Sequence, residues 1–210
     1  ALFDWAVAQG RACLLLDYSG CGLSAGEDAG GDFAAGTLTR WRDEVLSLID
    51  DQIDGPPILV GSSMGGWLML LCALALDARG ASPQVAGLIG IAAAPDFTDW
   101  GYDAGQKARL AAGETVLEDN PYGPEPTPIH PGFWADGENL RLLDAAIPIA
   151  CPVRLLHGQR DADVPWEIAL RLAERLRSDD VQVTLIKDGD HRLSRDGDIA
   201  LLLHTAASLR

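Results

Sequence analysis

Residues 58–71 read ILVGSSMGGWLMLL, an apolar run, a glycine-rich turn and a second apolar run. The first run predicts a short buried strand, and the second predicts an apolar helix that begins directly after the turn. Within the turn, residues 61–65 match the pattern G-x-S-x-G with Ser63 at the centre. This stretch therefore predicts a sharp strand-to-helix turn of the nucleophile-elbow kind, with an exposed serine hydroxyl.

The glycines of this turn have a steric reason. A strand that reverses into a helix within a few residues forces its central residue into a strained backbone conformation. Residues two positions before and after the centre then crowd one another unless they lack a Cβ atom. The helix behind the turn also directs its first N–H groups toward the serine, which makes the Met64 N–H a candidate oxyanion donor. A serine in an ordinary glycine turn is the simpler alternative.

Length and composition limit the class of protein. The 210 residues suit one α/β domain, and 48% hydrophobic with 22% charged residues is ordinary for a globular chain. A net charge of −15 argues against a nucleic-acid or anionic-membrane partner, and no stretch is long and apolar enough to span a bilayer. The four cysteines form no C-x-x-C pair and no metal spacing with the histidines. We therefore expect no metal or cofactor, and a reducing location (the cytoplasm or an organelle matrix) rather than secretion.

Predicted strands and helices alternate along most of the chain. Besides the strand before Ser63, strands are expected at residues 12–17, 84–92, 153–156 and 181–186. Besides the helix after Ser63, helices are expected at residues 2–8, 39–53, 166–177 and 196–209. Thr39 is a possible N-cap of the second of these helices. This alternation predicts an α/β fold with a mostly parallel sheet covered by helices on both faces.

Residues 93–151 interrupt the alternation with a long segment rich in Pro, Gly, Asp and Trp. A loop this long inside a compact domain usually has a function, so we expect a cap over the active site of a single domain that covers residues 1–210. Short helices are expected within it at 106–112 and 139–146. Its aromatic side chains could line an apolar acyl pocket or could simply hold the segment onto the domain: Phe97, Trp100, Tyr122, Phe133 and Trp134.

Three predicted strands end near groups that could act together. A serine hydroxyl needs a base within hydrogen-bond reach, and that base needs an orienting acid. Because sites in open parallel sheets gather at the carboxyl ends of the strands, Ser63, Asp161 and His191 are the candidates for these roles. Asp163 and Asp190 are alternatives for the acid. The chain order Ser, Asp, His is typical of hydrolases with a nucleophile elbow.

The other histidines compete less well for the role of base. They are His130, His157 and His204. His157 ends a predicted strand directly before Gly158, so we expect it to anchor the loop that follows. His191 instead follows the last strand in a polar, glycine-containing turn, which suits a general base.

Four motifs resemble landmarks of the α/β-hydrolase superfamily: DYSGCGLS at 17–24, GSSMGGWL at 61–68, HGQRDADVPW at 157–166 and GDHR at 189–192. The set is similar in particular to the mitochondrial depalmitoylase branch, whose members act as acyl-protein thioesterases and cleave acyl glucuronides. The resemblance covers nearly the whole chain. By position, it implies that Ser63 is the nucleophile, Asp161 the acid and His191 the base.

The expected activity is therefore hydrolysis of carboxylic esters or acyl thioesters through an acyl-enzyme, with a small-molecule acyl substrate and no cofactor. Alternatives are a non-catalytic ligand-binding protein of the same fold, or an amidase, lactonase or carbon–carbon hydrolase with the same triad. In the superfamily that the chain resembles, a strand and a loop before the opening helix supply a second oxyanion N–H. We accordingly expect about 30–60 further residues upstream in the natural protein.

Overall fold

The computed structural model describes residues 1–26, 32–80, 84–120 and 123–209, which form two compact units. The first unit comprises Ala1–Leu16, Val45–Pro95 and Leu142–Arg210, and the second comprises Asp17–Glu44 and Asp96–Arg141. Most of the segment expected to form a cap, residues 93–151, thus belongs to the second unit. The cap itself, and the single domain of residues 1–210, stay predictions.

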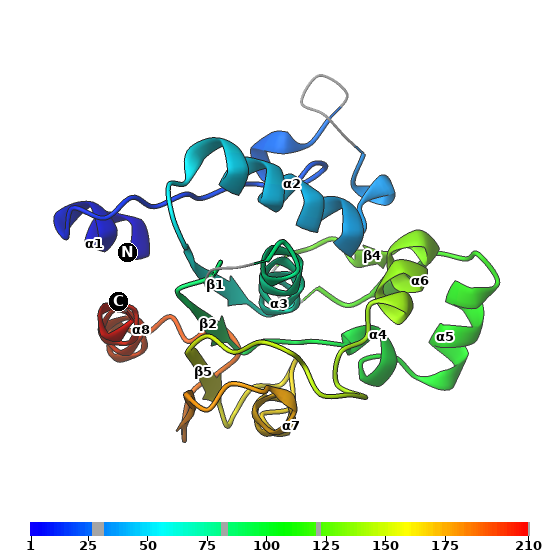
Figure 1. The fold of residues 1–210 in the computed structure, drawn as a ribbon. Coiled ribbons are helices and arrows are strands. Elements are labelled where there is room, and N and C mark those ends of the chain that lie inside the picture. The colour runs from blue at the N-terminus through cyan, green and yellow to red at the C-terminus, as the bar shows by residue number, and fades with distance from the viewer. Residues whose placement is uncertain (27–31, 81–83, 121–122, 210) are drawn as a thin grey trace. The chain divides into compact units, whose positions relative to one another are not determined.

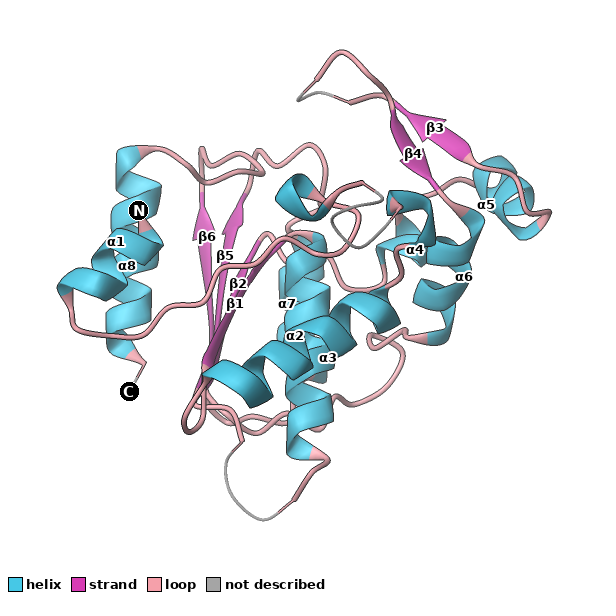
Figure 2. Cartoon of the chain, turned by 90° about the horizontal axis from the view of Figure 1, so that it is seen from above, coloured by secondary structure: helices cyan, strands magenta, loops and turns pink. Residues whose placement is uncertain are grey.

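The first unit is built on a four-stranded parallel sheet with the order β1-β2-β5-β6. The strands are β1 (Ile58–Ser62), β2 (Gly87–Ile91), β5 (Val153–Gly158) and β6 (Val181–Ile186). All three pairings are parallel, so the strands end at one common edge, as Figure 2 shows. The predicted parallel sheet is confirmed, and its carboxyl edge is where ligand sites of such sheets lie.

Helices cover both faces of this sheet (Figures 1 and 2). On one face lie α3 (Met64–Asp77) and α7 (Glu167–Arg175), and on the other lie α1 (Leu2–Ala8) and α8 (Asp196–Ser208). Helix α3 is apolar all round because it is almost wholly buried, with Trp67 and Leu70 fully shielded from solvent. This rigid central helix fixes the turn at Ser63 in place.

The second unit is smaller and irregular. Its elements are η1 (Gly22–Ser24), η3 (Phe33–Ala35), α4 (Phe97–Trp100), α5 (Ala104–Ala111), α6 (Pro131–Asn139) and a hairpin of β3 (Val116–Glu118) and β4 (Thr127–Ile129). Helix α2 (Leu38–Gln52) has residues in both units. Apolar side chains of α5, β3 and the preceding turn form a local core, with Leu110 and Val116 each 2% exposed.

Two predicted elements are wrong. Residues 12–17 form no strand, and Leu14 and Leu15 are 37% and 67% exposed. An apolar run becomes a strand only with a hydrogen-bonded partner, and this one pairs with no other described strand. Of the helix expected at residues 139–146, only Asn139 is helical, as the last residue of α6. Pro131 occupies the start of α6, where proline is favoured, although the proline-rich and glycine-rich composition of this region is typical of a loop.

The N-cap residue of α2 also differs from the prediction. The Thr37 hydroxyl accepts a hydrogen bond from the Arg40 N–H at 3.1 Å, which is the role expected of Thr39. Thr39 instead donates from its backbone N–H and its hydroxyl to the Asp136 carboxylate at 2.8 and 2.7 Å.

The other predicted helices and strands are present with modest shifts at their ends. In the described part of the chain, no helix has both the length and the apolar composition to cross a membrane.

Candidate active site

Ser63 is the single residue between the end of β1 and the start of α3. Its backbone has φ 53° and ψ −123°, a strained conformation for a residue with a side chain. Three backbone hydrogen bonds hold it there: its N–H donates to the Ile91 carbonyl at 2.9 Å, and its carbonyl accepts from Gly66 at 2.9 Å and Ala94 at 3.0 Å. The predicted sharp, strained turn is confirmed.

The glycines that flank Ser63 are required by packing. A Cβ atom on Gly61 would lie 2.1 Å from the Gly65 carbonyl oxygen, so the crowding expected across the turn is present. A Cβ atom on Gly66 would lie 2.4 Å from the Ala93 Cβ, so this glycine allows α3 to approach the segment after β2. A side chain on Gly61 would force the backbone of the turn apart, and a side chain on Gly66 would push α3 away from Ala93.

Met64 is the first residue of α3, directly after Ser63. The N–H groups of a helix's first turn have no acceptor within the helix, and the positive end of the helix dipole favours negative charge there. The Met64 N–H therefore has the position expected of an oxyanion donor, and this role stays a prediction.

Asp161 lies just beyond the end of β5 and its side chain is fully shielded from solvent. Its Oδ1 accepts hydrogen bonds from the N–H groups of Asp163 and Val164, both at 2.9 Å. Its Oδ2 lies 2.9 Å from His191 Nδ1 and 3.2 Å from His157 Nε2. Burial raises the pKa of the Asp161 carboxyl, but these hydrogen bonds outweigh burial and hold the pKa well below its ordinary value. The carboxylate therefore stays charged at neutral pH.

His191 presents Nδ1 to this carboxylate, and its side chain is 16% exposed. The hydrogen bond to Asp161 raises the pKa of His191, although burial opposes it, and the charges of Asp161, Asp163 and Asp190 raise it further. With Nδ1 engaged, Nε2 is the atom left to act on a nucleophile. Within the described residues, no hydrogen bond joins Ser63 to His191, so the structure supports the acid–base pair directly and Ser63 as nucleophile stays a prediction.

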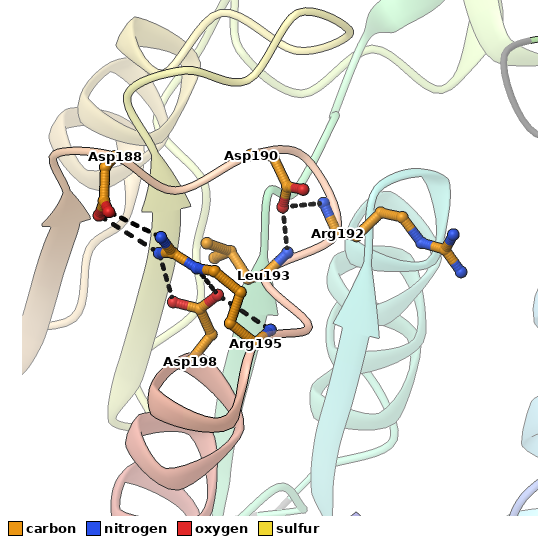
Figure 3. A network of polar contacts seen from close by, with 6 residues as sticks. All are labelled: Asp188, Asp190, Arg192, Leu193, Arg195 and Asp198. Carbon is orange, nitrogen blue, oxygen red and sulfur yellow. Dashed lines mark hydrogen bonds and ion pairs between the residues drawn. The ribbon is translucent and has the colours of Figure 1, made fainter.

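The loop that carries His191 is closed by an ion-pair network at its ends (Figure 3). Arg195, just before α8, reaches Asp188, which follows β6, with Nη1 at 2.7 Å from a carboxylate oxygen. The same guanidinium contacts the buried Asp198 carboxylate of α8 through Nε at 2.8 Å. Because one side chain joins both ends of the loop, the position of His191 is braced from outside the site.

The loop is also ordered from within. The Asp190 carboxylate accepts hydrogen bonds from the N–H groups of Arg192 and Leu193 at 3.1 and 3.0 Å, closing a turn around His191 (Figure 3). At its other side the loop packs tightly on the end of β5, because a Cβ on Gly158 would lie 2.3 Å from the Gly189 carbonyl oxygen. Asp190 thus shapes the turn, whereas Asp161 is the carboxylate bonded to the imidazole.

Comparison with known proteins shows the family of the chain. A family model described as the alpha/beta hydrolase family matches residues 1–200. The chain belongs to the alpha/beta hydrolase family. The predicted fold and the predicted class of enzyme, a hydrolase, are confirmed, and so is the resemblance to the mitochondrial depalmitoylase branch.

The similar curated proteins include "Palmitoyl-protein thioesterase ABHD10, mitochondrial" of mouse and human. The mouse protein is 41% identical over 213 residues, which cover 100% of this hydrolase chain and 68% of the mouse protein. The human protein is 38% identical over 218 residues, which cover 100% and 66%. The chain thus spans about two thirds of the length of these relatives.

Two solved structures have the same fold and appreciable identity. A putative hydrolase from Agrobacterium vitis S4 has a TM-score of 0.89 and 40% identity, with 98% of this hydrolase chain and 78% of that chain covered. Alpha/beta hydrolase domain-containing protein 10 from mouse has a TM-score of 0.83 and 38% identity, with 98% and 80% covered.

The aromatic residues proposed for an acyl pocket in this hydrolase belong to the second unit: Trp100, Phe133 and Trp134. Tyr122 lies outside the described residues. Phe133 is 9% exposed, and its ring centroid lies 5.8 Å from those of both Trp41 and Phe97. Trp134 donates its ring N–H to a backbone carbonyl of α4 at 3.2 Å. These contacts show that Phe133 and Trp134 help to hold the second unit together, and an acyl pocket stays a prediction.

The prediction from the sequence did not include the hydrogen bonds that the Asp161 carboxylate accepts. The two N–H donors to Asp161 follow from the local order Asp161-Ala162-Asp163-Val164, since an aspartate readily accepts bonds from N–H groups two and three residues later. That signal was available in the sequence. The bracing by Arg195 was not, because it joins residues across the loop whose proximity only the fold creates.

His157 is buried at 0% exposure and bonds the Val164 carbonyl, so its predicted role as a loop anchor is confirmed.

Candidate metal ligands also meet at this site. One ligand atom each from Asp161, Asp163 and His191 lies within 4.8 Å of the others. The hydrogen bond of 2.9 Å between Asp161 and His191 accounts for their approach without an ion. The expectation of no metal stays a prediction.

Proposed function

We propose that this protein is a serine hydrolase that cleaves carboxylic esters or acyl thioesters through an acyl-enzyme intermediate. The observation that carries the proposal is the hydrogen bond of 2.9 Å between Asp161 and His191, at the carboxyl edge of the sheet in which β1 leads into the strained turn at Ser63. A charged acid, an oriented imidazole and a serine at the start of a helix are the three parts that acyl transfer requires.

The first half of the reaction follows from the imidazole's orientation. Because Nδ1–H of His191 donates to Asp161, Nε2 keeps its lone pair and takes the proton from the Ser63 hydroxyl. The serine oxygen bonds to the acyl carbon, and the carbonyl oxygen becomes an oxyanion that the Met64 N–H stabilises. The imidazolium then gives its proton to the departing alcohol or thiol, which leaves the acyl group on Ser63.

The second half repeats these steps with water. His191 takes a proton from a water molecule, the resulting oxygen attacks the acyl carbon, and the proton passes to Ser63 as the acid product leaves. The buried negative charge of Asp161 stabilises the imidazolium in both halves. This stabilisation agrees with the raised pKa of His191, since the charged form is the one that accumulates at each transition state.

We infer that acyl thioesters are the favoured substrate class. The inference is supported by the names of the curated relatives, palmitoyl-protein thioesterases that are themselves called mitochondrial. A thiol is a better leaving group than an alcohol because its pKa is several units lower, about 8.5 for a cysteine thiol. Of the two predicted locations, an organelle matrix agrees with those names, and the cytoplasm stays a prediction.

The test compares Ser63→Ala with Ser62→Ala, a control that removes the neighbouring, exposed hydroxyl of the same turn. Turnover of a p-nitrophenyl ester by the full-length protein should fall by about 10⁴-fold or more in Ser63→Ala and by less than tenfold in Ser62→Ala. Retained turnover in Ser63→Ala would refute the assignment.

Two further measurements separate the alternatives. A fluorophosphonate probe should label the unchanged protein and the Ser62→Ala variant but not Ser63→Ala. Absence of labelling in all three would favour the non-catalytic ligand-binding alternative. A panel of short esters, long-chain esters, acyl thioesters, amides and lactones then ranks the substrate classes by kcat/KM, and the long-chain thioesters should lead it.

A further inference from the structure

The Asp161 carboxylate has one more side-chain neighbour than a Ser-His-Asp arrangement requires. His157 Nε2 lies 3.2 Å from Asp161 Oδ2 and 3.0 Å from the Val164 carbonyl oxygen. The side chains of His157 and Asp161 are both completely shielded from solvent. One carboxylate oxygen is therefore shared by two imidazole rings, one of which has no part in the proposed proton transfers.

The surroundings of His157 decide which of its nitrogens carries the proton. Both neighbours of Nε2, a carboxylate and a backbone carbonyl, can only accept hydrogen bonds, so Nε2 must be the donor. Nδ1 is buried and has no hydrogen-bond partner among the described residues. A proton on Nδ1 would be a buried donor without an acceptor, which is costly. The ring therefore carries a hydrogen on Nε2, which is bonded to the Val164 carbonyl and also lies within reach of the Asp161 carboxylate.

We propose that His157 is a positioning residue that holds Oδ2 of Asp161 toward His191. The proposal rests on the proposed function, because it concerns the acid of that triad. Two backbone N–H groups at 2.9 Å donate to the Oδ1 atom, and His157 Nε2 lies 3.2 Å from the Oδ2 atom. The carboxylate thus has N–H neighbours at both oxygens besides His191, and these neighbours oppose rotation of its plane away from the catalytic imidazole.

The N–H group of His157 also reduces the negative charge of the Asp161 carboxylate that acts on His191. The carboxylates of Asp161, Asp163 and Asp190 act on the His191 ring, and of these only Asp161 is bonded to it. Loss of the His157 donor would leave more charge on Oδ2 and so stabilise the protonated form of His191. A purely structural role for His157 would lower activity by loosening the fold but would leave the proton affinity of His191 unchanged.

The experiment compares three variants of the full-length protein. His157→Leu removes the donor, His157→Gln keeps an N–H donor on a side chain of comparable reach, and Leu155→Ala disturbs the same buried strand two residues away. We expect kcat/KM for a p-nitrophenyl ester to fall about 10- to 100-fold in His157→Leu, with KM little changed. In His157→Leu, the midpoint of the acid limb of the kcat/KM profile should move to higher pH by about half a pH unit or more. His157→Gln should recover most of the rate and return the limb toward its original position.

The control defines the result that overturns the proposal. Leu155→Ala should lower thermal stability without moving the acid limb. If His157→Leu and Leu155→Ala lose activity alike and the limb stays in place in both, His157 is only a packing residue.

A second measurement needs no variant and no turnover. In ¹⁵N spectra of the unchanged protein, His157 should show a protonated Nε2 and an unprotonated Nδ1. A proton on His157 Nδ1 would overturn the proposal. Because these spectra are independent of catalysis, a protein that binds esters without cleaving them would refute the proposed function alone.

Discussion

Replacing Asp161 by asparagine changes one atom of the side chain and should remove most of the turnover. The N–H groups of Asp163 and Val164 both donate to Oδ1, so the carbonyl oxygen of an asparagine is drawn to that position. Its NH₂ group then faces His191 Nδ1, where a hydrogen bond forms only if Nδ1 is the acceptor. The imidazole proton would consequently sit on Nε2, and no lone pair would face Ser63.

The expected loss is large because the variant stabilises the wrong tautomer and removes a charge. For a triad acid, this substitution lowers kcat by about 10⁴-fold, which corresponds to about 5.5 kcal/mol in the activation free energy. KM should change little, since the proposed mechanism gives Asp161 no contact with the substrate. The assay is the steady-state hydrolysis of a p-nitrophenyl ester by the full-length protein, with urea unfolding to verify that the variant is folded.

Asp163→Asn is the matched control, because Asp163 was the alternative acid and lies two residues away. Its backbone N–H, which is the group that supports Asp161, is unaffected by the substitution. We expect kcat to fall less than tenfold in this control. Equal losses in the two variants, or a loss below tenfold in Asp161→Asn, would show that Asp161 is not the acid of the triad.

Two further predictions concern pH and the turn at Ser63. The proposed base is neutral His191, and its pKa is raised. We therefore expect kcat/KM to increase with pH through a midpoint above the ordinary histidine value of about 6.5. A midpoint below pH 6, in measurements from pH 5 to pH 9, would contradict this. Gly61→Ala should destabilise the fold by about 1–3 kcal/mol or more in urea unfolding, because its Cβ would lie 2.1 Å from the backbone oxygen of Gly65. Gly132→Ala in α6, where a Cβ meets nothing within 4 Å, should change stability by less than about 1 kcal/mol, and equal effects would contradict the steric argument.

Much of the candidate site could be predicted from the sequence because a parallel sheet converts order along the chain into proximity. Ser63, Asp161 and His191 each follow a strand, and the strands end at one edge, so knowing the strands was enough to group these residues. The choice between Asp161 and its neighbours could be ranked but not settled from the pattern, because it depends on the direction in which each carboxylate points. In the structure, Asp161 is bonded to His191 at 2.9 Å, which favours Asp161, and its role as the acid stays a prediction.

The errors in the predicted fold have different physical causes. The apolar residues of 12–17 indicate a preference for burial, but a strand also needs a partner that local sequence does not specify. Helix α6 was missed because proline and glycine at its start resemble a loop, although proline is well suited to a first turn. The hairpin of β3 and β4 was missed because each strand has only three residues, too few for a periodic pattern.

The two substitutions around the acid, taken together, separate charge from packing. Asp161→Asn removes the anion, so the pKa of His191 should fall and the acid limb of kcat/KM should move to lower pH. His157→Leu keeps the anion and removes one of its donors, so the limb should move to higher pH. Both variants should lose activity. If the site were only loosened, the acid limbs of the two pH profiles would shift in the same direction, or neither would shift. Shifts of opposite sign would therefore locate the effect in the hydrogen bonds of a single carboxylate.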